Sequence, residues 1–227
     1  MPCPRFHRFF ALALFLIPAW ARAQSSDVPA EPKLYLGLRA GYSNYTITGT
    51  EVDLHTRPGA DQVLRVPGLT AGAVVRRRLY KPLSAQCEVL YVREGGNFTR
   101  RVFTGKSTYD IDCVQVPLLL DVRLGGPSGP ALHLQGGVAF VAVVNGVELD
   151  ATSFAPGNRF NNQGSFWAQA YGAELAWAHE RRVYTLTARF TQDLTDYYQR
   201  DYQGTPYHAR SHGFSISAGM LFAQQTH

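Results

Sequence analysis

Apolar and polar residues alternate with a period of two in eight stretches of the chain, and a segment rich in turn-forming residues separates each stretch from the next. Such alternation is typical of β-strands with one apolar face. No segment of helical period and no domain linker interrupts the series. The predicted strands cover residues 33–45, 68–80, 85–95, 112–124 (entered from about 109), 131–145, 165–178, 183–193 and 213–222.

The connections between these strands alternate in length. Segments 46–67, 146–164 and 194–212 are long, and 96–108 is somewhat shorter. The intervening segments 81–84, 125–130 and 179–182 are short turns. An even number of antiparallel strands with this alternation predicts an all-β fold, an eight-stranded antiparallel up-and-down transmembrane β-barrel. In such a barrel the short turns face the periplasm and the long loops face the outside of the cell.

Charge separates the two faces of the predicted strands. The apolar face is nearly free of charged residues, with Arg77 as the exception, and aromatic residues lie near both ends of the strands, as in interfacial girdles. An eight-stranded barrel has an interior that side chains can fill, so acids and bases on the other face should pair inside it. A soluble, lipocalin-like binding barrel is the alternative, with the faces reversed. The predicted polar network of the lumen consists of Arg39, Arg76, Arg78, Glu88, Glu94, Gln115, Asp121, Arg123, Glu174 and Arg189.

The N-terminus carries the features of a secretory signal peptide. Arg5 and Arg8 precede a short apolar run, and Ala21-Arg22-Ala23 provides a small-x-small cleavage site. We therefore expect a cleaved signal peptide over residues 1–23, a polar lead-in over 24–32, the barrel over 33–222 and a tail over 223–227. The expected location is the bacterial outer membrane.

Removal of the signal peptide changes the charge balance. The whole chain has 22 Lys and Arg against 17 Asp and Glu, and residues 1–23 hold three of the arginines and no acid. The remainder therefore has 19 basic and 17 acidic residues, a net charge of +2. Without a basic helix or a basic-aromatic patch, this composition gives no support for nucleic-acid binding. We expect no cofactor, outer-membrane lipids as surroundings, and a monomer.

Two cysteines, Cys87 and Cys113, remain after signal cleavage, and an exported protein with two cysteines suggests a disulfide. The predicted strand directions argue against it. Cys87 lies near the short-turn end of one strand, and Cys113 lies near the long-loop end of the next strand. We predict that both thiols are free.

A proline lies inside the fourth predicted strand, where it removes a backbone donor. The alternation points Pro117 into the lumen, where polar groups or a bulge could satisfy the freed carbonyl. The segment Gln115-Val116-Pro117-Leu118-Leu119-Leu120-Asp121 resembles a strand of the PorT-like outer-membrane barrels of Bacteroidetes-type bacteria, which has the form acid-Ile-Pro-Leu-Leu-Leu-Lys. The segment Cys87 to Gly96 is a second similar piece. The resemblance implies an outer-membrane barrel in which Gln115 replaces an acid and Asp121 replaces a base.

Enzyme chemistry is the alternative from a different class, since some barrels of this size modify lipid A. The candidates are His208, Ser211, His212 and Ser215, with Glu174 or Asp193 as the acid. Nothing in their spacing specifies a triad, which is recognised by geometry. The pair His208 and His212 is likewise not assigned as a metal site, and we predict a protein without enzymatic activity.

The predicted loop 194–212 has the composition of a binding surface. Tyrosine and arginine are favoured anchor residues at such surfaces. A glycan or a protein partner would fit this loop, and an interfacial belt with an ordered loop is the structural alternative. The candidate binding residues are Tyr197, Tyr198, Arg200, Tyr202, Tyr207 and Arg210.

Overall fold

A computed structural model describes residues 33–48, 63–100, 105–125, 129–150, 164–196, 198–202 and 205–224. The predicted signal peptide and lead-in lie outside these residues. The described part of the chain contains no helix long and apolar enough to cross a membrane. Its regular elements are the strands β1 (Leu34–Thr48), β2 (Val63–Arg78), β3 (Leu83–Arg100), β4 (Gly105–Leu124), β5 (Ala131–Asp150), β6 (Ser165–His179), β7 (Arg182–Asp193), β8 (Tyr198–Tyr202) and β9 (Thr205–Gln224).

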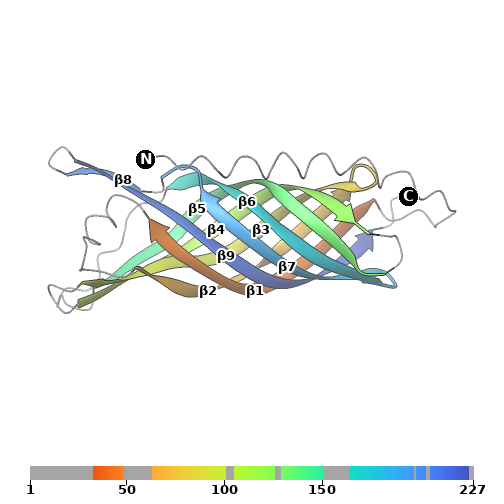
Figure 1. Ribbon diagram of the computed structural model, residues 1–227, viewed down its shortest axis with the longest axis horizontal. Helices are drawn as coiled ribbons and strands as arrows, with labels where there is room; N and C mark the ends of the chain where they lie inside the picture. Colours follow the sequence, from red (N-terminus) through yellow and green to blue (C-terminus); the bar gives the residue numbers. More distant parts are fainter. Residues whose placement is uncertain are drawn as a thin grey trace. The chain divides into compact units, whose positions relative to one another are not determined.

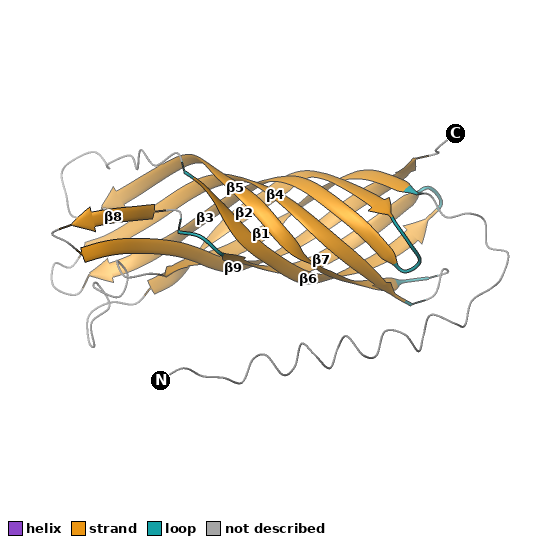
Figure 2. Ribbon diagram, turned by 90° about the horizontal axis from the view of Figure 1, so that it is seen from above, coloured by secondary structure: helices purple, strands orange, loops and turns teal. Residues whose placement is uncertain are grey.

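Eight of these strands close into a barrel (Figure 1). Each strand from β1 to β6 pairs with the next one in the chain. β7 pairs with β9, and β9 pairs back with β1. All of these pairs are antiparallel. The predicted fold class is therefore confirmed. The short strand β8 pairs with the outer part of β9, from Tyr198 opposite Ala209 to Tyr202 opposite Thr205. This hairpin projects beyond one end of the barrel (Figure 2).

Several strands are longer than the alternation predicted. β3 and β4 leave only residues 101–104 between them, so most of the predicted loop 96–108 is strand. β9 begins at Thr205, inside the predicted loop 194–212, and it ends at Gln224, so the predicted tail 223–227 was placed two residues too early. The physical reason is that a ladder needs only backbone groups. Pairing therefore continues where the side chains no longer alternate.

The outer surface of the barrel is apolar, with large exposed side chains on all eight strands. Leu38 is 67% exposed, Leu69 is 70% exposed and Leu120 is 55% exposed. A water-soluble protein does not leave such a continuous apolar surface uncovered, so the lipocalin-like alternative is wrong. Aromatic pairs lie towards both ends of this belt. Trp177 stacks on Tyr184 with ring centroids 6.1 Å apart, and Phe140 meets Trp167 edge-on at 5.5 Å.

The inner wall explains two sequence features. Pro117 points inward and is fully buried, as predicted, and the β3–β4 ladder skips the positions between Cys87↔Leu118 and Leu90↔Gln115. Gly72 faces the lumen at a point where β2 and β3 approach each other closely. A Cβ atom at this position would lie 1.9 Å from the Val89 carbonyl oxygen, so no larger residue fits there. Glycine therefore permits the tight curvature that closes a small barrel.

Candidate functional site

A network of charged side chains crosses the lumen. Six of them form what we call the lumen plug, and all six are at most 6% exposed. The plug contains three guanidinium groups and three carboxylates, so its formal charge is balanced. It consists of Arg39 on β1, Arg76 on β2, Glu88 on β3, Asp121 on β4, Glu174 on β6 and Arg189 on β7.

Glu88 and Glu174 are the centres of the plug. Glu88 accepts two bonds from Arg189, with Nη1 2.6 Å from Oε2 and Nη2 2.8 Å from Oε1. Arg39 bridges the two acids, because its Nη1 lies 2.8 Å from Glu88 and its Nη2 lies 2.7 Å from Glu174. Glu174 also accepts bonds from Arg76 and from the Thr187 hydroxyl. Two-point arginine–carboxylate contacts of this kind are among the strongest hydrogen bonds in proteins.

Neutral side chains complete the network. Gln86 bonds to both Arg76 and Glu88. Gln135 on β5 donates to Asp121 at 3.1 Å and accepts a bond from Arg189 at 3.0 Å. Among the described residues, these contacts therefore join seven of the eight barrel strands, from β1 to β7. Buried charges are tolerated when they are paired and hydrogen-bonded in this way, and the result is a rigid obstruction across the lumen.

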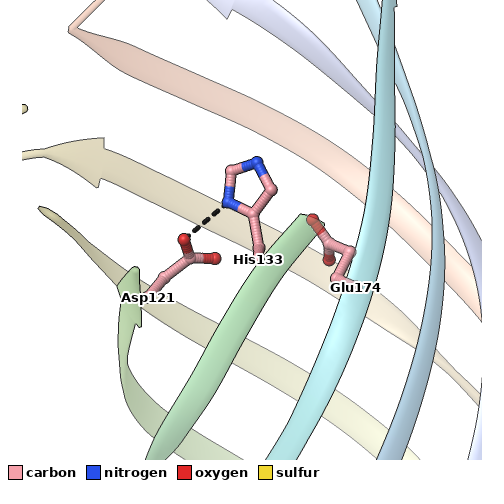
Figure 3. Close-up of side chains that lie close together, drawn as sticks. All are labelled: Asp121, His133 and Glu174. Atoms are coloured by element: carbon pink, nitrogen blue, oxygen red, sulfur yellow. Dashed lines mark hydrogen bonds and ion pairs between the residues drawn. The ribbon is translucent and has the colours of Figure 1, made fainter. Parts of the chain in front are cut away.

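One corner of the plug has the composition of a metal site. Ligand atoms of Asp121, His133 and Glu174 all lie within 4.8 Å of one another, and Figure 3 shows the three side chains projecting into the same space. Nδ1 of His133 is 2.6 Å from Oδ1 of Asp121. However, the Arg76 guanidinium contacts both acids, at 3.5 Å from Asp121 and in a shorter bond with Glu174. A divalent cation would have to displace that arginine, so the geometry fits an ion-pair node better than a metal centre.

An apolar layer lies in the lumen beyond the plug, towards the β8–β9 hairpin. The alternation alone did not predict it. Cys113, Val141 and Phe166 belong to one buried cluster, and Tyr45 with Val92 belongs to another. The lumen is therefore not polar throughout.

A second polar group, the outer acid pair Glu94 and Asp193, lies at the hairpin end of the lumen. The Ser211 hydroxyl donates to Oε2 of Glu94 at 2.7 Å, and the Ser211 backbone N–H donates to Oδ2 of Asp193 at 2.5 Å. Gln115 donates to the other oxygen of Glu94. This site joins two of the predicted lumen residues to two residues that were considered as catalytic candidates.

The outer acid pair lies near the outer edge of the apolar belt. Arg93 and Gln192 beside it are polar and face outward, whereas Leu194, the other neighbour of Asp193, is 45% exposed. Both carboxyls are buried, with Glu94 2% exposed and Asp193 4% exposed. The two acids share no ion pair with a base among the contacts found in the described part of the chain.

Among the catalytic candidates whose side chains are described, no serine contacts a histidine. Ser211 faces the lumen, whereas its neighbour His212 faces outward, with its ring 6.2 Å from that of Phe190. Glu174 belongs to the plug, far from Ser211 along the barrel. The side chain of His208 lies outside the described residues, so the proposed histidine pair is not tested.

The remaining predicted residues lie at the two ends. Arg78 and Arg123 are half-buried near the short turns, and both take part in interactions. Arg210 is exposed at the base of the β8–β9 hairpin, with Nε 2.6 Å from Oδ1 of Asp196. Tyr197 lies outside the described residues. For Tyr198, Arg200, Tyr202 and Tyr207 the backbone is described and the side chains are not.

A closed eight-stranded barrel with an apolar exterior and a buried polar lumen defines the class of membrane β-barrels. The chain belongs to the family described as outer membrane protein beta-barrel domain, whose model matches residues 22–199. It is therefore a protein of the bacterial outer membrane. No match was found among curated protein sequences.

Solved structures show the same architecture at low sequence identity. The outer membrane protein OprG from Pseudomonas aeruginosa is 12% identical, with a TM-score of 0.51 over 87% of this chain and 100% of its own. The outer membrane protease OmpT from Escherichia coli is 8% identical, with a TM-score of 0.47 over 88% and 100%. Neisserial surface protein A is 9% identical, with a TM-score of 0.46 over 83% and 97%. At these identities the similarity concerns the fold alone.

Proposed function

We propose that this protein is a closed outer-membrane scaffold that presents its extracellular hairpin to a binding partner, and that it is neither a pore nor an enzyme. The lumen plug is the observation that carries this proposal. Its buried ion pairs tie together strands on all sides of the barrel and leave the charges mutually neutralised. The β1–β9 ladder closes the barrel, so among the described residues none of its eight strands is an edge strand open to association, which supports a monomer.

The separation of the candidate catalytic residues supports a role without catalysis. A serine needs a base within hydrogen-bond reach to act as a nucleophile. Ser211 instead bonds to two carboxyl groups, and its histidine neighbour lies on the other face of the strand. Among the described residues, no arrangement of serine, histidine and acid supports the alternative of an enzyme that modifies lipid A.

The β8–β9 hairpin is the proposed binding element. The register pairs Tyr198 with Ala209, Arg200 with Tyr207 and Tyr202 with Thr205. Residues directly opposite in an antiparallel ladder, and those two positions apart, belong to the same face. The three tyrosines and the arginine of this hairpin therefore share one face by register. Aromatic rings pack against the C–H faces of sugars and arginine bonds to their oxygens, so we propose a carbohydrate chain as the partner.

Surface plasmon resonance on the full barrel in nanodiscs tests this role. The probe is the saccharide of outer-membrane lipopolysaccharide, freed of lipid A by mild acid. Replacement of Tyr198, Arg200, Tyr202 and Tyr207 by serine should weaken binding by about tenfold or more, since anchor residues carry most of a binding energy. The control replaces Gln199, Asp201 and His208, which belong to the opposite face, and should bind like the unmodified barrel. Equal binding by both variants, or no binding by the unmodified barrel, contradicts the proposal.

We also propose that the chain is a PorT-like member of the family. The support is the segment from Gln115 to Asp121 with its central Pro117, and the two departures of this segment from the PorT-like pattern have partners in the lumen. Asp121, which replaces a base, pairs with His133 and Arg76, and Gln115, which replaces an acid, donates to Glu94. If these departures are compensated, then exchanging the charges of Asp121 and Arg76 together should preserve folding better than Asp121→Lys alone, as measured by heat-dependent mobility in gels.

A further inference from the structure

The short-turn end of the barrel carries a ring of exposed positive charge. Five exposed side chains form this basic rim: Lys33, Arg77, Lys81, Arg181 and Arg182. Glu180 is the one exposed acid among the described residues at that end. At the hairpin end, by contrast, the described side chains include three arginines, Arg65, Arg93 and Arg210, and four carboxyls, Glu94, Asp112, Asp193 and Asp196. Among the side chains that the structure describes, the excess of exposed positive charge therefore lies at the short-turn end.

The rim is divided between opposite sides of the barrel. Arg77 lies near the end of β2 and Lys81 lies in the β2–β3 turn, whereas Arg181 lies in the β6–β7 turn and Arg182 begins β7. These two turns are four strands apart in a closed ring of eight strands. A single docked protein would contact one continuous patch on one side of the barrel. Charges on both sides suit a partner that surrounds the barrel.

Each basic pair lies at the edge of the apolar belt. Next to Arg77 and Lys81, the side chain of Tyr80 is 77% exposed. On the other side, the stacked rings of Trp177 and Tyr184 precede and follow the turn that carries Arg181 and Arg182. Trp and Tyr mark the level of lipid headgroups in membrane proteins. The rim therefore lies where headgroup phosphates meet the barrel.

We propose that the basic rim binds the anionic phospholipid headgroups of the periplasmic leaflet. Exposed Lys and Arg at a membrane surface attract anionic headgroups, and the aromatic side chains beside them hold the rim at the required depth. The proposal concerns the end of the barrel opposite to the hairpin and does not depend on the proposed glycan binding.

Spin-label measurements of lipid selectivity test the proposal on the full barrel reconstituted in phosphatidylcholine bilayers. Spin-labelled phosphatidylglycerol should associate with the barrel about threefold more strongly than spin-labelled phosphatidylcholine at low salt. An attraction of about 1 kcal/mol per charge near the surface corresponds to about fivefold and is reduced by screening. High salt should remove most of the preference. The variant Arg77→Gln, Lys81→Gln, Arg181→Gln, Arg182→Gln should show a preference near one.

The matched control is Arg65→Gln, Arg93→Gln, Arg210→Gln, which removes exposed arginines from the hairpin end and should keep the preference of the unmodified barrel. Heat-dependent gel mobility establishes that each variant is folded. The proposal is overturned if the unmodified barrel does not discriminate between the two lipids or if the rim variant retains its full preference. If the hairpin-end control loses the preference and the rim variant keeps it, the lipid contact lies at the hairpin end, and the proposal is overturned as well.

Discussion

Arg189 and Glu88 form a two-point ion pair between β7 and β3, at 2.6 and 2.8 Å, in a lumen that excludes solvent from both side chains. Removal of Arg189 leaves the plug with one more buried negative charge than positive, and an uncompensated buried charge costs roughly 3–5 kcal/mol. Arg189→Leu should therefore lower the free energy of unfolding by about that amount, as measured by urea titration in detergent micelles. Arg189→Leu combined with Glu88→Leu removes both charges and should recover part of the loss. A single variant as stable as the unmodified barrel contradicts this role of the pair.

Leu118 and Val138 lie directly opposite each other on β4 and β5 and face outward, at 52% and 42% exposure. Arginine in the middle of the lipid-facing belt costs roughly 2–4 kcal/mol. Leu118→Arg and Val138→Arg should each destabilise the barrel by that amount in urea unfolding within lipid bilayers. Leu79→Arg, at the edge of the belt, should cost at most about 1 kcal/mol. Equal effects at the three positions would contradict the assigned lipid-facing register.

Cys87 and Cys113 should be recovered as free thiols. Cys87 lies opposite Leu118 and Cys113 lies opposite Val92, so the cysteines are five positions apart along the ladder. At about 3.4 Å per residue that is about 17 Å, whereas a disulfide requires Cα atoms about 4.4–6.8 Å apart. Alkylation followed by non-reducing mass spectrometry checks this. A linked Cys87–Cys113 peptide would mean that the β3–β4 register is different.

The face assignment could be predicted from the sequence because a period of two is a local property. Leu38 outward and Arg39 inward follow from neighbouring residues alone, and the same argument placed Glu88 and Glu174 in the lumen. The particular ion pairs could not be predicted. Arg189 and its partner Glu88 are separated by 101 residues, and their contact depends on strand register and tilt around the whole barrel.

The alternation also failed where the membrane ends. Val92, Val141 and Phe166 occupy lumen-facing positions although they are apolar. Their outward-facing neighbours Tyr91, Phe140 and Trp167 are apolar as well, so both faces of the strands are apolar at this level. Strand ends such as Arg100 were missed because backbone pairing continues without that signal. The contacts of Ser211 with Glu94 and Asp193 could not be predicted either, because they depend on the register between separate strands.

Single-channel recording in planar lipid bilayers tests the central claim, a lumen closed by paired charges, most directly. An eight-stranded lumen filled by side chains has no continuous water path, and the plug residues contact one another across it. The purified barrel should show no steady conductance, while a porin recorded under the same conditions opens normally. Large, stable and reproducible openings of the unmodified barrel would contradict the account.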